Sequence, residues 1–183
     1  IPAVFLRLAG CNLRCRGFSY VDPTSGEHLG CDSKAVWRQG EKYDFSRLID
    51  HWRAQDWLTP LSNGAHLVIT GGEPVIQQVP LIGFLQALDQ TLGMACFTEI
   101  ETNATLPFHP DLLSRINQIN ASPKLSNSGE ALKMIYTQKH MAPLIERSNA
   151  VFKFVISAPC DVDEVLQQFV LPFHLPRDRV YLM

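Results

Sequence analysis

Apolar residues recur along the chain in short β-type runs, separated by stretches with helical spacing. In the helical stretches, apolar residues stand three or four positions apart, so each stretch has one apolar face that can cover a sheet. Strands that alternate with helices favour parallel pairing. The six predicted strands are Val4–Leu8, His66–Thr70, Cys96–Glu101, Ile116–Ala121, Val151–Ile156 and Val180–Met183.

Two helix boundaries are marked by single residues. Asp161 with Glu164 three residues later predicts a capping box at the start of a helix. Gly93 follows the last apolar turn of an earlier helical stretch, where a C-terminal cap is expected.

The chain has 183 residues, a hydrophobic content of 46% and a formal net charge of −2. A chain of this length can bury one substantial core and is short for two domains, so residues 1–183 are predicted to form a single domain. The chain begins without methionine and ends on the apolar run Val180–Met183, so we expect short segments to be missing at both ends.

The charge balance argues against some classes of partner. With 16 basic and 18 acidic residues, the chain has no excess of positive charge for a nucleic-acid backbone. No apolar run approaches the roughly 18 residues of a membrane span, and the first residues look like a strand rather than a signal peptide. We therefore expect a soluble cytoplasmic protein that acts on a small molecule, with neither nucleic acid nor membrane among its partners.

Three of the five cysteines lie near the start of the chain, in a segment rich in Gly, Pro, Ser and Asp. Such a segment is typical of a loop, which can turn sharply enough to wrap a metal site. As cluster ligands, Cys11, Cys15 and Cys31 would leave one iron of a four-iron cluster open to a small molecule. A zinc site is the alternative, because His28 would complete a Cys₃His set. The odd number of cysteines disfavours a disulfide framework and favours reduced thiols.

A glycine-rich turn follows the apolar run Leu67–Ile69, with the sequence Thr-Gly-Gly-Glu-Pro at residues 70–74. Gly71 and Gly72 would let the backbone approach a ligand closely, and Glu73 offers a carboxylate that suits a cationic amine. An ordinary turn is the other interpretation. Taken with the three cysteines, the turn favours an iron–sulfur site over zinc.

These motifs resemble those of the radical S-adenosylmethionine superfamily and, within it, those of the 7-carboxy-7-deazaguanine synthase family. The matching stretches follow the family's order, span nearly the whole chain, and comprise residues 2–13, 31–33, 68–74, 101–103, 122–124 and 152–155. The departures are the long insertion between the second and third cysteines, Gly30 where an aromatic residue is common, and Ala104 where a glycine is usual.

The resemblance implies a single radical S-adenosylmethionine core domain, a partial TIM-like barrel of about six parallel strands with a reduced set of helices. It implies a lyase that converts 6-carboxytetrahydropterin to 7-carboxy-7-deazaguanine with loss of ammonia, in queuosine-type deazapurine biosynthesis. The implied cofactors are a [4Fe–4S] cluster, S-adenosylmethionine and Mg²⁺. The implied partners are the pterin substrate, an electron donor such as flavodoxin and a second copy of the chain in a homodimer.

The resemblance also assigns roles to individual residues. Cys11, Cys15 and Cys31 would hold the cluster, and the Ser33 hydroxyl would bind Mg²⁺. No catalytic side chain is expected beyond the cofactor ligands. Arg7 would present a guanidinium fork to a substrate carboxylate. The other implied contacts are Gly71, Gly72, Glu73, Ser122 and Lys124 with S-adenosylmethionine, and Thr70 and Glu101 with the substrate.

Glu99 and Glu101 share one face of their predicted strand, and one of them could accept hydrogen bonds from the N–H groups of a pterin. The family match falls on Glu101. Two rival functions use some of the same motifs. An activating enzyme for glycyl-radical enzymes shares the cysteine loop and the Gly-Gly-Glu-Pro turn but gives no reason for Arg7 and Glu101. A zinc-stabilised interaction module without enzymatic activity would use His28.

Overall fold

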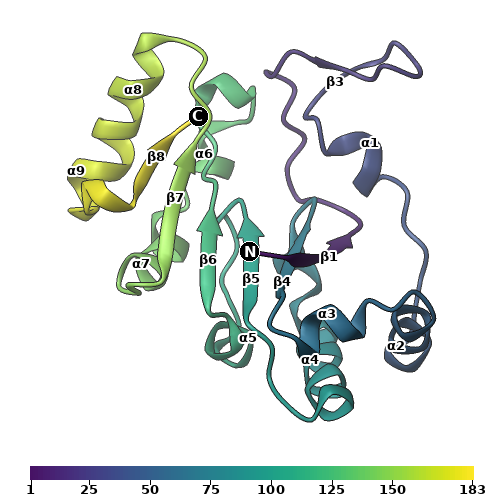
Figure 1. The fold of residues 1–183 in the computed structure, drawn as a ribbon. Coiled ribbons are helices and arrows are strands. Elements are labelled where there is room, and N and C mark those ends of the chain that lie inside the picture. Colours follow the sequence, from purple (N-terminus) through teal and green to yellow (C-terminus); the bar gives the residue numbers. More distant parts are fainter.

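The computed structural model describes residues 1–183, except the side chain of Gln138. Six strands form one sheet in which every neighbouring pair is parallel. They stand in the order in which they occur along the chain (Figure 1), which confirms the predicted parallel α/β architecture. They are β1 (Ala3–Leu8), β4 (His66–Gly71), β5 (Thr98–Thr102), β6 (Gln118–Ala121), β7 (Ala150–Phe154) and β8 (Val180–Leu182).

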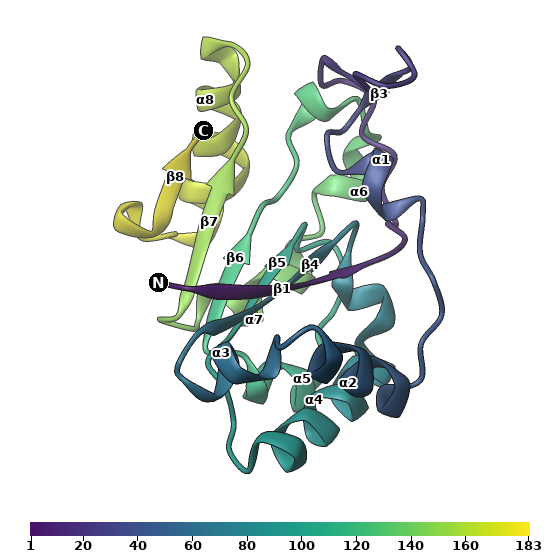
Figure 2. The same ribbon diagram turned by 45° about the vertical axis from the view of Figure 1, so that its right-hand side comes forward.

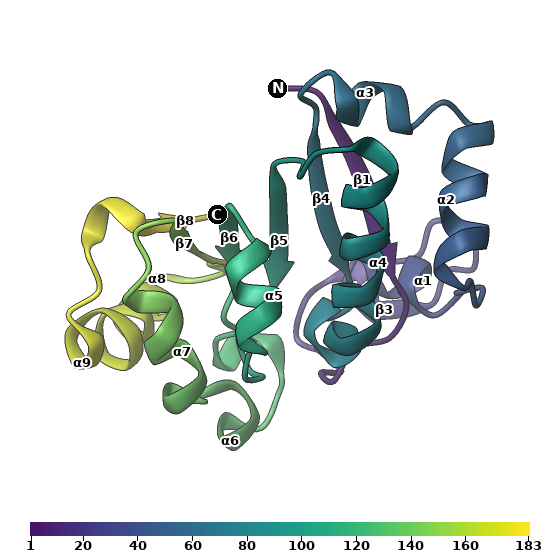
Figure 3. The same ribbon diagram turned by 90° about the horizontal axis from the view of Figure 1, so that it is seen from below.

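The helices cover one face of this sheet. The longer ones are α2 (Phe45–Ala54), α4 (Gln78–Leu92), α5 (Pro110–Arg115), α7 (Gln138–Ile145) and α8 (Pro159–Val165). Each strand is followed by the next in the same direction across the sheet, and such crossovers are right-handed, so successive helices fall on the same side. Figure 3 shows α4, α5 and α7 outside the arc of strands. The strands β1 and β8 lie at opposite edges of the sheet, so the curved sheet stays open between them. It therefore forms the predicted partial barrel.

The predicted loop between the second and third cysteines contains a two-stranded antiparallel hairpin, β2 (Tyr20–Val21) and β3 (His28–Gly30). These strands are too short to show an alternation in the sequence. The other short elements are α1 (Lys34–Trp37), α3 (Leu58–Ser62), η1 (Pro74–Gln77), η2 (Ser126–Ser128), α6 (Leu132–Ile135), η3 (Leu166–Val170), α9 (Leu171–Phe173) and η4 (Arg177–Arg179). Among the described residues, no helix is both long and apolar enough to cross a membrane.

Two predicted strands begin later than the sequence suggested. The predictions placed their starts at Cys96 and Ile116, but β5 begins at Thr98 and β6 at Gln118. The Asn117 side chain explains part of this difference, because its Oδ1 accepts a hydrogen bond from the Thr98 N–H at 2.9 Å. At the start of β5, the Thr98 N–H thus donates to a side chain instead of to the backbone of a neighbouring strand.

The core lies between the sheet and its helices. Leu67 of β4 and Ile100 of β5 are fully buried, as are Phe84 and Leu88 on the predicted apolar face of α4. Each such side chain contributes roughly 1.5–3 kcal/mol through its burial. The α4 helix ends at Gly93, whose φ of +71° confirms the predicted C-terminal cap. This packing fixes the carboxyl ends of the strands, where working residues gather in folds of this kind.

The capping box predicted from Asp161 and Glu164 is wrong. The helix α8 begins at Pro159, so Asp161 lies inside its first turn. Its Oδ2 accepts hydrogen bonds from the backbone N–H of Ser157 at 2.7 Å and of Ala158 at 2.9 Å. The bond from Ser157 is the main cause that lowers the pKa of the Asp161 carboxyl. Glu164 points elsewhere and accepts a hydrogen bond from the Tyr136 hydroxyl at 2.5 Å.

Replacing Asp161 with Asn should therefore lower the free energy of unfolding by about 1–2 kcal/mol at pH 7, because charge-assisted hydrogen bonds are lost. A lowered folded-state pKa gives stability that is present above the unfolded pKa of about 3.9 and lost as the pH falls below it. The difference from the unchanged protein should thus shrink below about pH 4. Urea unfolding at pH 7 and pH 3 checks this, with exposed Asp163→Asn on the same helix as control. An equal loss at both pH values would contradict it.

Candidate active site

A cavity of about 850 Å³ opens at the carboxyl ends of the strands. Figure 2 shows β3 and α1 above this end of the sheet, where the cysteine loop lies. The cavity brings together every predicted site residue except Arg7 and Glu73. Those that line it are Cys11, Cys15, Cys31, Ser33, Thr70, Gly71, Gly72, Glu101, Ser122 and Lys124.

The three predicted cluster ligands share one wall of this cavity. Cys15 is buried, while Cys11 and Cys31 are partly exposed. Burial raises the pKa of the Cys11 thiol and raises the pKa of Cys15 to about 12, and the Lys124 charge opposes both shifts. Buried thiols of this kind ionise when they bind a metal cation. Among the described residues, no group of three or more His, Cys, Asp or Glu side chains converges closely enough to hold a single metal ion.

The zinc alternative has less support from the geometry. His28, which would complete the Cys₃His set, lies on β3 with its side chain exposed. It is not among the residues that line the cavity with the cysteines. The donor set inside the cavity is therefore the three thiols, which fit a cluster with one open iron.

The glycine-rich turn lies against the cysteine loop. A Cβ atom added to Gly72 would lie 2.2 Å from the carbonyl oxygen of Gly10 and 2.7 Å from the Cβ of Cys11. The backbone N–H of Glu73 donates to the same Gly10 oxygen at 2.9 Å. Gly72 is thus needed for the close approach of two loops, and this approach sets the position of Cys11.

Glu73 is completely buried and is not part of the cavity wall. Its Oε1 accepts a hydrogen bond from the Thr102 hydroxyl at 2.8 Å and its Oε2 accepts one from the backbone N–H of Asn103 at 2.6 Å. Burial raises the pKa of the Glu73 carboxyl. The carboxylate therefore links the turn after β4 to the end of β5, and a contact with a bound amine stays a prediction.

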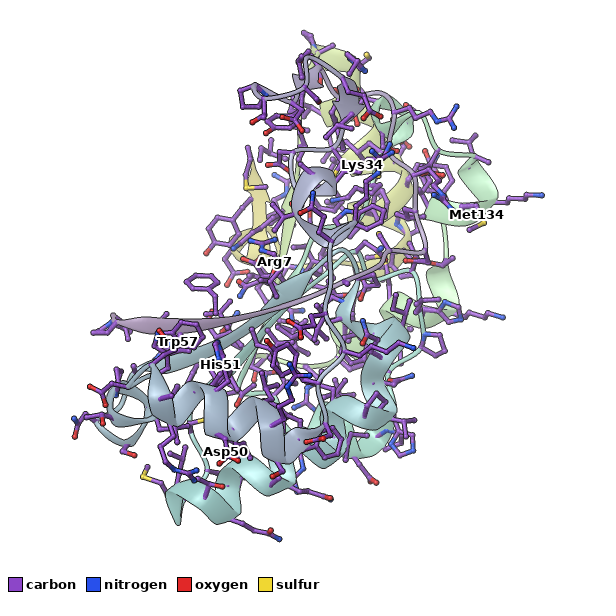
Figure 4. The ribbon with its side chains drawn as sticks, turned by 90° about the vertical axis from the view of Figure 1, so that its right-hand side faces the viewer. Arg7, Lys34, Asp50, His51, Trp57 and Met134 are labelled. Carbon is purple, nitrogen blue, oxygen red and sulfur yellow. The ribbon has the colours of Figure 1, made fainter. Side chains whose placement is uncertain are left out.

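The floor of the cavity carries a hydrogen-bonded pair from neighbouring strands. The Thr70 hydroxyl donates to Oε2 of Glu101 at 2.7 Å. Arg7 is paired in register with Thr70, so its exposed side chain lies on the same open face of the sheet, outside the cavity wall. Figure 4 shows Arg7 on the side of β1 away from Asp50 and His51 of α2.

Two further predicted residue groups lie on the cavity wall. The Lys124 ammonium donates to the Ser122 hydroxyl at 3.0 Å, so both side chains are held together. The Ser33 hydroxyl donates to Oδ1 of Asp32 at 3.1 Å. Hydroxyl and carboxylate oxygens together are a fitting donor set for a hard cation such as Mg²⁺.

Sequence reasoning did not assign three polar residues that line the same cavity, Asn103, Asn120 and Lys153. Asn103 donates from Nδ2 to Oδ1 of Asn12 at 3.0 Å. Asn120 is paired in register with Glu101, and side chains of paired residues in parallel strands share a face. That register was the missing signal, because it identifies Asn120 only when the strand pairing is known.

Ala104, one of the departures from the resembling motifs, adopts a left-handed φ of +59°. This conformation costs a non-glycine residue about 1–2 kcal/mol, and the methyl group is buried outside the cavity. Relief of the strain in Ala104→Gly should offset the lost methyl burial, so that the free energy of unfolding changes by less than about 0.5 kcal/mol. Ala121→Gly, at a buried strand position, should cost about 2 kcal/mol. Equal losses in the two variants by urea unfolding would contradict the strain argument.

Comparison with known proteins gives a consistent set of relatives. No family model matches the chain. The chain is 35% identical to the 7-carboxy-7-deazaguanine synthase of Pyrobaculum aerophilum over 185 residues, which cover 100% of this chain and 70% of that protein. It is 30% identical to the protein of the same name from Hyperthermus butylicus, covering 99% of this chain and 68% of the relative. The Rhodopirellula baltica protein of that name is 28% identical, covering 99% of this chain and 65% of the relative.

Proposed function

Because the chain belongs to the 7-carboxy-7-deazaguanine synthase family, we propose that its cavity holds a [4Fe–4S] cluster, S-adenosylmethionine and a pterin together. The protein is a radical S-adenosylmethionine lyase that converts 6-carboxytetrahydropterin to 7-carboxy-7-deazaguanine with loss of ammonia. One observation carries the assignment of this site. The three cysteines, the Gly-Gly turn and Glu101 line a single cavity.

The cofactor end of the cavity has the donors that this proposal needs. Cys11, Cys15 and Cys31 would hold the cluster, and the bound cluster and S-adenosylmethionine together supply one-electron radical chemistry. The turn at Gly71 and Gly72 and the side chains of Ser122 and Lys124 would line the S-adenosylmethionine site. Glu73 would act through the backbone of Asn103, whose position it fixes by a 2.6 Å hydrogen bond.

The substrate end combines an acceptor with a cation. Glu101 would accept hydrogen bonds from the N–H groups of the pterin, and the Thr70 hydroxyl keeps its carboxylate in one orientation. Arg7 would bind the substrate carboxylate from the neighbouring strand with its planar guanidinium fork. In this arrangement the two ends of the substrate are recognised by opposite charges, which fixes the orientation of the ring system.

Several further features belong to the same proposal. Ser33, supported by Asp32, would bind Mg²⁺ near the third cysteine. An electron donor such as flavodoxin would reduce the cluster, and two copies of the chain would form a homodimer in the cytoplasm.

Anaerobic purification followed by iron, sulfide and zinc analysis tests the proposal. We expect about four irons per chain and an electron paramagnetic resonance spectrum of the reduced protein that changes when S-adenosylmethionine is added. With 6-carboxytetrahydropterin and a reductant, the protein should then form 7-carboxy-7-deazaguanine. One zinc and no iron per chain would refute the proposed radical chemistry. Four irons per chain without conversion of the pterin would support the proposed cluster and refute 6-carboxytetrahydropterin as the substrate.

A further inference from the structure

Asn120 lies on the cavity wall beside Glu101, and a hydrogen bond to Glu99 fixes the orientation of its side chain. We propose that Asn120 presents its side-chain oxygen to the 2-amino group of the pterin as a second acceptor beside Glu101, and that Glu99 and His66 are positioning residues for it. This inference rests on the proposed function, because it names how the same cavity distinguishes its substrate.

The orientation of the Asn120 amide follows from its partner. Its nitrogen Nδ2 lies 3.0 Å from Oε2 of Glu99. An ionised carboxylate only accepts hydrogen bonds, so the NH₂ group of Asn120 must face Glu99 and the carbonyl oxygen must face away. No hydrogen bond to that oxygen is formed within the part of the chain that the structure describes. Because the residue lines the cavity, this free oxygen is available to a ligand.

Glu99 is itself held by a second contact. His66 lies with its Nδ1 2.6 Å from Oε1 of Glu99, and their side chains are only 16% and 22% exposed. The His66 ring stacks on Phe97, with ring centroids 4.1 Å apart and planes 22° from parallel. The largely buried Glu99 carboxylate therefore has a hydrogen-bond partner on each of its two oxygens, as a buried polar group requires. Glu99 in turn accepts the hydrogen bond from Asn120, which lines the cavity. His66 and Glu99 therefore position a residue that contacts the substrate.

The placement of the two acceptors matches the donor edge of a pterin. Glu101 and Asn120 are register partners on adjacent parallel strands, which run about 4.8 Å apart. The pterin edge carries a ring N–H and a 2-amino group with two N–H bonds. Glu101 can accept from the ring N–H and one amino N–H, which leaves the second amino N–H for Asn120. A 2-oxo ring would place an oxygen against the Asn120 oxygen instead.

The experiment compares two probes on the iron-loaded protein with S-adenosylmethionine bound. They are 6-carboxypterin and 6-carboxylumazine, which carries a 2-oxo group in place of the 2-amino group. In Asn120→Leu we expect the Kd of 6-carboxypterin to rise about tenfold, because one hydrogen bond is lost. The Kd of 6-carboxylumazine should not rise, and iron content and the Kd of S-adenosylmethionine should stay unchanged. If Asn120 had only a structural role, the Kd values of both probes would rise together in this variant.

A matched pair of variants tests the positioning residues. Asn120→Asp alone places two carboxylates together and should weaken 6-carboxypterin binding. The double variant Glu99→Gln with Asn120→Asp reverses the direction of the hydrogen bond and keeps an acceptor toward the cavity, so 6-carboxypterin binding should recover to within about threefold. Gln118→Leu is the control, because Gln118 lies on the same face of β6, in register with Glu99, outside the cavity wall.

The outcomes separate this inference from the proposed function. If the unchanged protein binds 6-carboxypterin and the ratio of the two Kd values is the same in Asn120→Leu, the role of Asn120 is refuted while the proposed function stands. If the double variant binds as weakly as Asn120→Asp, the role of Glu99 is refuted. If the unchanged iron-loaded protein binds S-adenosylmethionine but neither probe, the pterin substrate is refuted, and this inference with it.

Discussion

Replacing Cys31 with Ala should leave the anaerobically reconstituted protein with less than about one iron per chain, against about four in the unchanged protein. Cys31 is one of three thiols on the cavity wall, and two thiolates do not retain a four-iron cluster that already has one open position. Formation of 7-carboxy-7-deazaguanine should fall below detection. Because Cys31 is partly exposed and follows the β3 strand, the substitution should leave the melting temperature of the iron-free protein unchanged.

Cys160→Ala is the matched control for this experiment. Cys160 is exposed, lies on α8 and is absent from the cavity wall. This variant should keep about four irons and the spectroscopic response to S-adenosylmethionine. Equal iron contents in the two variants would show that the cluster ligands have been assigned to the wrong thiols. One zinc in the unchanged protein that is lost both in Cys31→Ala and in His28→Ala would restore the zinc alternative.

The parallel pairing of the strands and the edge of the sheet that carries the site follow from patterns in the sequence. Apolar runs such as Leu67–Ile69 identify buried strands, and a turn such as that at Gly71 and Gly72 marks where a strand ends. In a parallel sheet all such ends lie at the same edge, so Cys11 and Glu101 meet although 90 residues separate them in the chain. Local pattern, sheet topology and the resemblance of the motifs to a known family together predicted the residues of this cavity.

The direction of individual side chains did not follow from the sequence. Asn120 was missed because its relation to Glu101 depends on the register of two strands, and no local pattern encodes register between strands that are distant in sequence. Glu73 shows the converse case. Its place in the motif is conspicuous, but whether its carboxylate faces a ligand or the protein depends on how closely β5 approaches. The spacing of the motif predicts where Glu73 lies in the fold, but it does not predict which group its carboxylate contacts.

Replacing Glu73 with Gln should lower the free energy of unfolding by about 2–3 kcal/mol. The Glu73 carboxylate accepts from the backbone N–H groups of Val75 and Asn103 and from the Thr102 hydroxyl. An amide has one accepting oxygen, so its NH₂ group must face one of these donors, and that donor stays unsatisfied in a fully buried site. The melting temperature of the iron-free protein should fall by about 5–10 °C. Glu146→Gln, an exposed position at the end of α7, should leave it unchanged.

The same variant tests two roles for Glu73. If its carboxylate fixes the Asn103 backbone, stability falls in the absence of cluster and S-adenosylmethionine, since every hydrogen bond involved lies within the chain. If the carboxylate also binds the amine of S-adenosylmethionine, the melting temperature of the cofactor-free protein falls equally, and the Kd of S-adenosylmethionine rises more than tenfold in addition, as expected when a charged partner is lost. Because Glu73 is completely buried and outside the cavity wall, we expect the loss of stability, and the Kd of S-adenosylmethionine then shows whether the predicted contact with the amine is made as well.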